Sequence, residues 1–157
     1  LLSALIRLPD LVAGILRQAP QLQQLAQRYA YLEHAYFIGR NLDYAVALEA
    51  SLKLKEISYI HSEAYPAGEL KHGTISLIEE GTFVVALACS DKLTEKTMSN
   101  IKEVKARGAE VLVVTTDDNR EVLPEAEPPQ PASMAADIAS AIERASAFFI
   151  FVFLLFV

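Results

Sequence analysis

Apolar residues follow two different spacings along most of the chain, and their alternation predicts the fold. Short, nearly continuous apolar runs lie at residues 35–39, 83–88 and 110–116, each next to glycine or polar residues, as is typical of buried strands. Between them, apolar residues recur every three or four positions at 42–57 and 92–107, which is the period of a helix. Strands that alternate with helices predict a parallel sheet with helices on both faces.

The remaining regions complete the predicted organisation. Residues 1–34 have helical spacing throughout and form an N-terminal helical segment. Residues 35–124 form the α/β core. Residues 125–132 include three prolines, which exclude a regular element and predict a linker. Residues 133–157 return to helical spacing and predict a C-terminal helix.

Prolines and short apolar runs predict further helix boundaries and short strands. Pro9 and Pro20 mark predicted helix boundaries in the N-terminal segment, because proline lacks a backbone N–H group. A short strand is predicted around residues 62–64, with helical turns at 67–78 and a short fifth strand at 122–123. The predicted fold is therefore a doubly wound α/β sandwich of three layers, flavodoxin-like, with five parallel strands.

Composition and charge exclude several classes of function. The 157 residues fit one domain, and 52% hydrophobic content can build a large core. A net charge of −6 without any basic run argues against nucleic acid and against an anionic membrane surface. The apolar run at 147–157 is shorter than the roughly 20 residues that span a bilayer. Cys89 is the only cysteine, so we expect a buried structural thiol and a reducing cytoplasm.

Candidate chemistry is concentrated between residues 48 and 78. Glu49, Lys53 and Glu56 are three and four residues apart, so they share one stripe of the predicted helix. The spacing alone favours a solvated ion-pair ladder. However, ligands of such sheets gather at the carboxyl ends of the strands. We therefore also expect Lys53 and Glu56 to open towards that edge of the sheet and to act in proton transfer, together with His72.

Other candidates carry weaker signals. Gly39-Arg40-Asn41 follows the first strand and is either a tight turn, which we favour, or an anion pocket at a helix N-terminus. Ser90 and Thr115-Thr116 are isolated hydroxyl groups that are candidates for holding a phosphate. His34 and His61 are expected to be structural. No residue pattern indicates a metal or cofactor site.

Three stretches resemble a known family. KLKEISYIHSEAYPAGELKHG, FIGRNLDYAVALEASLKLKE and SNIKEVKARGAEVLVVT are similar to the second sugar-isomerase (SIS) subdomain of the glucosamine-6-phosphate synthases, the isomerizing glutamine–fructose-6-phosphate aminotransferases. The resemblance covers roughly residues 5 to 124. It implies an SIS fold and a role in amino sugar biosynthesis.

The resemblance also implies residue roles. Glu56 matches the isomerase base, which moves a proton between C1 and C2 of the aminated sugar. Lys53 matches a lysine that helps to polarise the substrate near its carbonyl and ring oxygens. His72 matches the histidine that opens the sugar ring and that reaches the active site of the other subunit, which implies a homodimer. Imidazole suits this task because it exchanges protons near neutral pH.

The family's complete enzyme makes glucosamine-6-phosphate from fructose-6-phosphate and ammonia derived from glutamine. Its glutaminase domain, its first SIS subdomain with a Ser/Thr-rich phosphate loop, and its tail lysine have no match here, so we expect this chain to be inactive alone. Two alternatives remain: a stand-alone SIS module that binds sugar phosphates and regulates another process, or a structural dimerisation domain. Lys53, Glu56 and His72 argue against the sensor, because a sensor needs no base.

Overall fold

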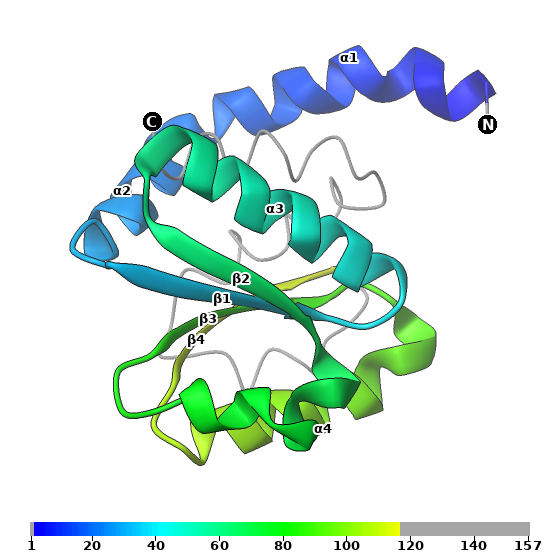
Figure 1. The fold of residues 1–157 in the computed structure, drawn as a ribbon. Coiled ribbons are helices and arrows are strands. Elements are labelled where there is room, and N and C mark those ends of the chain that lie inside the picture. Colours follow the sequence, from blue (N-terminus) through cyan, green and yellow to red (C-terminus); the bar gives the residue numbers. More distant parts are fainter. Residues whose placement is uncertain (1, 117–157) are drawn as a thin grey trace.

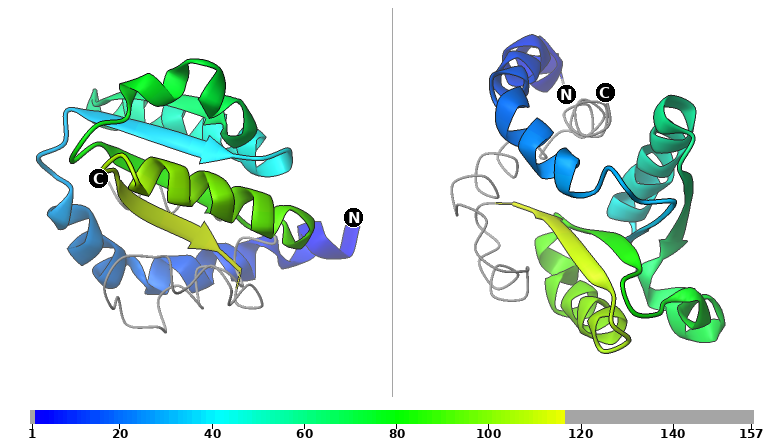
Figure 2. Two further views of the ribbon diagram at one scale, coloured as in Figure 1. Left: turned by 90° about the horizontal axis from the view of Figure 1, so that it is seen from below. Right: turned by 90° about the vertical axis from the view of Figure 1, so that its left-hand side faces the viewer.

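The structure of the protein, a computed structural model, describes residues 2–116 (Figure 1). The predicted fifth strand at 122–123, the linker 125–132 and the C-terminal helix 133–157 lie outside the described residues. The described part contains one parallel sheet with helices packed on both of its faces (Figures 1 and 2). This arrangement confirms the predicted α/β class.

Four parallel strands form the sheet within the described residues. They are β1 (His34–Gly39), β2 (His61–Pro66), β3 (Phe83–Ala88) and β4 (Glu110–Thr115), in the spatial order β2-β1-β3-β4. This is the strand order of the flavodoxin-like doubly wound fold. The strand predicted around residues 62–64 is longer than expected, because it pairs along the whole of β1.

The register of the strands defines two edges of the sheet. His34 lies opposite His61 and Phe83 opposite Glu110, so these residues mark the amino edge. All four strands then run in the same direction to the carboxyl edge, where Gly39 lies opposite Pro66. Any helix that connects two of these strands must therefore run back from the carboxyl edge to the amino edge.

Three helices lie on one face: α1 (Leu2–Arg17), α2 (Ala19–Arg28) and α3 (Leu42–Ser58) (Figure 2). Pro20 stands in the first turn of α2, as predicted. The boundary predicted at Pro9 is wrong, because α1 continues through this residue. Proline inside a helix removes one backbone hydrogen bond and crowds the preceding turn, so this continuation lowers the stability of α1.

The opposite face is covered by 3-10 helices and one further α-helix. After β2 come two 3-10 helices, η1 (Ala67–His72) and η2 (Thr74–Leu77), and after β3 come η3 (Asp91–Leu93) and α4 (Thr94–Lys105). The helix predicted from residue 92 thus begins as a 3-10 turn. The residue before the first α-helical turn is Leu93, which makes no side-chain cap hydrogen bond.

The core is divided into two apolar clusters by the sheet. The first lies under α1, α2 and α3 and includes Leu22, Ala47, Leu54 and Phe37. The second lies under η1 and α4 and includes apolar side chains from both helices and from the other face of the strands. All six residues of β3 are buried, because this strand has neighbours on both sides and helices on both faces.

Candidate functional site

The predicted stripe on α3 is formed in the structure. Lys53 Nζ lies 2.6 Å from Glu56 Oε2, where it donates a hydrogen bond, and 3.7 Å from Glu49 Oε1. The side chains of Lys53 and Glu56 are 34% and 50% exposed. The hydrogen bond to Glu56 raises the pKa of Lys53, so the amine is a cation at neutral pH. An exposed pair of this kind is accessible to a small molecule.

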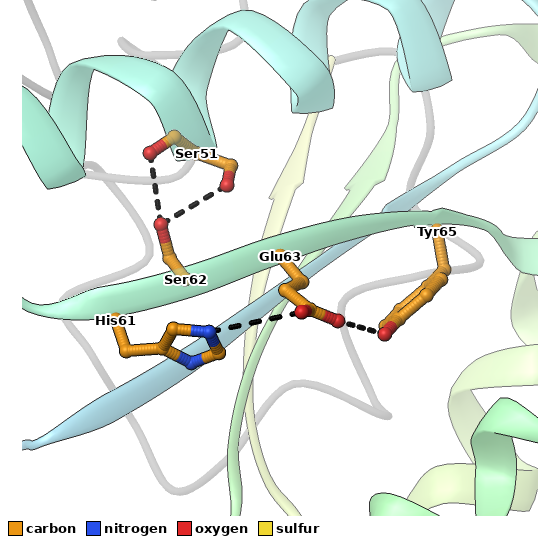
Figure 3. Close-up of polar contacts among 5 residues, drawn as sticks. All are labelled: Ser51, His61, Ser62, Glu63 and Tyr65. Carbon is orange, nitrogen blue, oxygen red and sulfur yellow. Dashed lines mark hydrogen bonds and ion pairs between the residues drawn. The ribbon is translucent and has the colours of Figure 1, made fainter.

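A buried contact sets the rotation of α3 about its axis. Ser62 Oγ of β2 donates a hydrogen bond to the Ser51 carbonyl oxygen at 2.8 Å and lies 3.0 Å from Ser51 Oγ (Figure 3). Both serines are buried. Because Ser51 faces the sheet, Lys53 and Glu56 turn to the side of the helix that remains open. Sequence reasoning missed this serine pair, since neither residue carries a motif.

The expected location of this pair is wrong. α3 begins after the carboxyl end of β1 and ends before His61, at the amino edge. Lys53 and Glu56 lie in its last two turns and therefore near the amino edge of the sheet, not the carboxyl edge. The spacing of the residues predicted their common face, but the direction of the crossover helix decides the edge.

His72 lies in a different part of the molecule. It is the last residue of η1, beyond the carboxyl end of β2, and its side chain is 76% exposed. Its Nε2 atom is 3.8 Å from Glu69 Oε2, one turn earlier in the same 3-10 helix. Gly73 follows with a φ of 146°, a conformation that favours glycine, and ends η1.

A single chain does not bring His72 to the Lys53–Glu56 pair. The pair lies on the face of the sheet covered by α3, near its amino edge, whereas His72 lies on the face of η1 and α4, beyond its carboxyl edge. The length of β2, about 20 Å for six residues, separates the two positions along the strand. Within one copy, the three predicted residues form two separate groups.

Several of the other predicted candidates make structural contacts, whereas the buried Thr116 Oγ1 has no hydrogen-bond partner within the described residues. Arg40 Nε donates to Asn100 Oδ1 of α4 at 3.0 Å, so its guanidinium turns towards α4. Thr115 Oγ1 donates to the Ala88 carbonyl oxygen at 2.9 Å and joins β4 to β3. Cys89 Sγ lies 3.6 Å from the Val114 carbonyl oxygen, and burial raises the pKa of its thiol. These contacts favour structural roles, and Cys89 is partly buried where a buried thiol was expected.

A cluster of polar side chains on the face of β2 opposite α3 was not predicted from the sequence. Glu63 Oε2 accepts a hydrogen bond from the Tyr65 hydroxyl, and Glu63 Oε1 lies 3.7 Å from His61 Nε2 (Figure 3). The hydrogen bond to Glu63 raises the pKa of Tyr65 to about 12. The rings of His34 and His61 meet edge-to-face, with centroids 5.5 Å apart. Both histidines are exposed, so neither is a core histidine.

A hollow of about 260 Å³ lies at the amino edge, between the segments that lead into β1 and β3, and Glu33, His34 and Glu79 are among its lining residues. It contains none of the three predicted site residues. Within residues 2–116, no group of three or more His, Cys, Asp or Glu side chains is arranged to hold a metal ion. None of the described helices is both long and apolar enough to cross a membrane.

Comparisons with known proteins give the context of these residues. The SIS domain family matches residues 30–151. The isomerizing glutamine–fructose-6-phosphate aminotransferase of Caldanaerobacter subterraneus is 56% identical over 119 residues, and that of Clostridium tetani is 52% identical over 116. These matches cover 76% and 74% of this chain but only 20% and 19% of the relatives, so the chain spans about a fifth of their length.

A solved structure agrees with the sequence comparison. The C-terminal domain of glucosamine-fructose-6-phosphate aminotransferase from Francisella tularensis superposes with a TM-score of 0.75 and 35% identity. The match covers 98% of this chain and 42% of that domain. The described fold therefore corresponds to less than half of the solved domain.

Proposed function

This chain belongs to the SIS domain family, and on that premise we propose that it is the second SIS subdomain of an isomerizing glutamine–fructose-6-phosphate aminotransferase. The complete enzyme would make glucosamine-6-phosphate from fructose-6-phosphate and ammonia released from glutamine, in the cytoplasm. The observation that carries the proposal is the 56% identity over 119 residues to a relative with that name.

In this proposal, Glu56 is the general base of the isomerisation. Its carboxylate takes a proton from C1 of the imine formed between fructose-6-phosphate and ammonia, and the same proton is returned at C2 to give the amino sugar. A carboxylate within reach of both carbons is suited to such a transfer. The exposed, hydrogen-bonded position of Glu56 on α3 supports this role, because the substrate can approach it from solvent.

Lys53 is the proposed electrostatic partner. Its ammonium lies 2.6 Å from Glu56 Oε2, so one side chain can stabilise the carboxylate and also attract the substrate oxygens on which negative charge develops. A fixed cation at such a position lowers the energy of the transition state more than that of the ground state. A lysine is already cationic at neutral pH, and the hydrogen bond to Glu56 raises the pKa of Lys53 further.

His72 is proposed to open the sugar ring in the site of a second subunit. The separation of His72 from Lys53 and Glu56 within one copy supports this arrangement, since the imidazole can join the pair only from another chain. Its 76% exposure leaves the ring free to enter a neighbouring site. The proposed functional unit is therefore a homodimer, completed by the glutaminase and first SIS parts of the parent protein.

A segment exchange tests this function. Residues 5–124 replace the corresponding segment of the Caldanaerobacter enzyme, and glucosamine-6-phosphate formation is measured with glutamine and fructose-6-phosphate. We expect activity of the same order as that of the unmodified enzyme. Glutamine hydrolysis shows that the glutaminase domain has folded, and binding of fructose-6-phosphate reports on the part that contains the exchanged segment. A chimera that hydrolyses glutamine but forms no glucosamine-6-phosphate, and binds fructose-6-phosphate normally, would favour a regulatory sugar-phosphate module instead.

A further inference from the structure

The 3-10 helix η1 has three distinct faces, because residues i and i+3 of such a helix lie one above the other. Ala67 and Leu70 form the first face and are almost completely buried in the second apolar cluster. Glu69 and His72 form another face, which is exposed. The fully buried Ala67 and Leu70 fasten η1 to the sheet, and contacts of its remaining face can add a second restraint on the rotation of the helix.

The remaining face of η1 meets polar side chains from other segments. Lys71 Nζ lies 2.7 Å from Glu103 Oε1 of α4. A Cβ atom on Gly68 would lie 3.0 Å from Arg40 Nη1 and Nη2, so the guanidinium rests against the backbone of η1. Glycine at position 68 therefore allows the turn after β1 to pack directly on η1.

These contacts are joined into one network. Asn100, which is 4% exposed, connects the two ends of this network. Asn100 Oδ1 accepts a hydrogen bond from Arg40 Nε at 3.0 Å, and Asn100 Nδ2 donates to Glu103 Oε2 at 3.2 Å. Burial acts to raise the pKa of Glu103, but the hydrogen bonds from Lys71 and Asn100 outweigh it and lower that pKa. Glu103 is thus a carboxylate at neutral pH, held between α4 and η1.

We propose that Glu103 is a positioning residue for His72. Through Lys71, and through Asn100 and Arg40, it fixes the rotation of η1 and with it the direction in which the imidazole leaves the helix. Lys71 and His72 are adjacent in η1, so a rotation that releases Lys71 from Glu103 also redirects His72. This inference rests on the proposed role of His72 in the isomerase site.

Amide hydrogen exchange in the chain itself tests the positioning. Glu103→Gln keeps the size of the side chain but removes its charge. We expect exchange in residues 68–73 to become several-fold faster, with exchange in β3 and the melting temperature nearly unchanged. Glu95→Gln, an exposed substitution on the same helix, is the matched control and should leave exchange in 68–73 unchanged. Unchanged exchange in 68–73 of Glu103→Gln, or an equal increase throughout the chain, would overturn the proposal.

Kinetics of the segment-exchange chimera test whether Glu103 affects the catalytic step through His72. Glu103→Gln should lower kcat for glucosamine-6-phosphate about 10-fold or more, because small misplacements of a reacting group are costly, while KM for fructose-6-phosphate and glutamine hydrolysis stay the same. Lys71→Met should have the same effect, and the double variant should lose no more than either one. Additive losses, or an unchanged kcat, would contradict the proposal. If the unsubstituted chimera is itself inactive, the proposed function fails, and exchange alone decides whether Glu103 positions η1.

Discussion

The two halves of the proposed site are held in place in different ways. Lys53 and Glu56 face one another because they are three residues apart on a long helix, so a single element positions them. His72 depends on contacts between segments that are distant in the sequence: Arg40 and Asn100, which are hydrogen-bonded, are 60 residues apart. The first half is a local feature, whereas the second exists only when the sheet has assembled.

This difference predicts how each half responds to change. Substitutions on the exposed side of α3 should change the rate of isomerisation, whereas substitutions on its buried side should change the stability of the whole chain. Substitutions around η1 should act on the orientation of His72 and only weakly on stability, because the network there is small and partly exposed.

The largest effect is expected at the base. Glu56→Gln in the chimera keeps the shape of the side chain but removes the basic lone pair, and it should lower glucosamine-6-phosphate formation by about 10²- to 10⁴-fold. Glutamine hydrolysis should be nearly unchanged. Glu49→Gln, on the same stripe, is the matched control and should retain most of the activity. Wild-type rates for Glu56→Gln would show that Glu56 is not the base.

The buried side of α3 should control stability. Leu54 is fully buried, so Leu54→Ala should lower the free energy of unfolding by about 2 to 5 kcal/mol. Leu52 lies on the same helix but is 42% exposed, and Leu52→Ala should change it by about 0.5 kcal/mol or less. Chemical denaturation of this chain measures both. Similar losses for the two variants would mean that the outer side of α3 is also covered in solution.

Mixed dimers can show whether the two halves meet between subunits. Chimeras with Glu56→Gln and with His72→Asn are expected to be inactive separately. If His72 acts in the partner's site, half of the dimers in an equal mixture combine the two variants, and each of these has one intact site. About a quarter of the wild-type activity should therefore return after subunit exchange. No recovery, with mixed dimers confirmed by mass spectrometry, would place both residues in the site of one subunit.

The smallest effect concerns pH. The pKa of Glu103 is lowered in the folded protein, so the unfolded chain binds a proton more readily. The stabilisation is therefore present above the ordinary carboxyl pKa and is lost as the pH falls through the lowered value. Since Lys71 is 64% exposed, we expect this pH-dependent stabilisation to be about 1 kcal/mol or less. Glu103→Gln should remove this acid dependence in denaturation curves, and an unchanged dependence would assign it to other carboxylates.

Outside these substitutions, the chain alone should form no glucosamine-6-phosphate from fructose-6-phosphate and ammonium. Even with ammonium supplied, a phosphate loop and a lysine for covalent binding are expected from other parts of the parent protein. Turnover by the isolated chain near that of a complete synthase would contradict the proposal that it is one part of such an enzyme.

The sequence by itself determined the order and type of most elements and one half of the candidate site. The apolar runs predicted β3 and β4 nearly to the residue, because strands buried in a sheet leave little room for polar side chains. The spacing of Lys53 and Glu56 predicted their contact, because helical geometry alone brings such neighbours together. The motif KLKEISYIHSEAYPAGELKHG indicated the SIS family.

The tertiary structure decided where these parts lie. The direction of α3 placed Lys53 and Glu56 near the amino edge, against expectation, because a crossover helix between parallel strands must run back along them. The separation of His72 from this pair follows from the packing of η1 on the other face. The direction of α3 follows from the predicted parallel order of strand, helix and strand. The separation of His72 could not be obtained from spacing, because contacts between distant segments depend on how the sheet is covered.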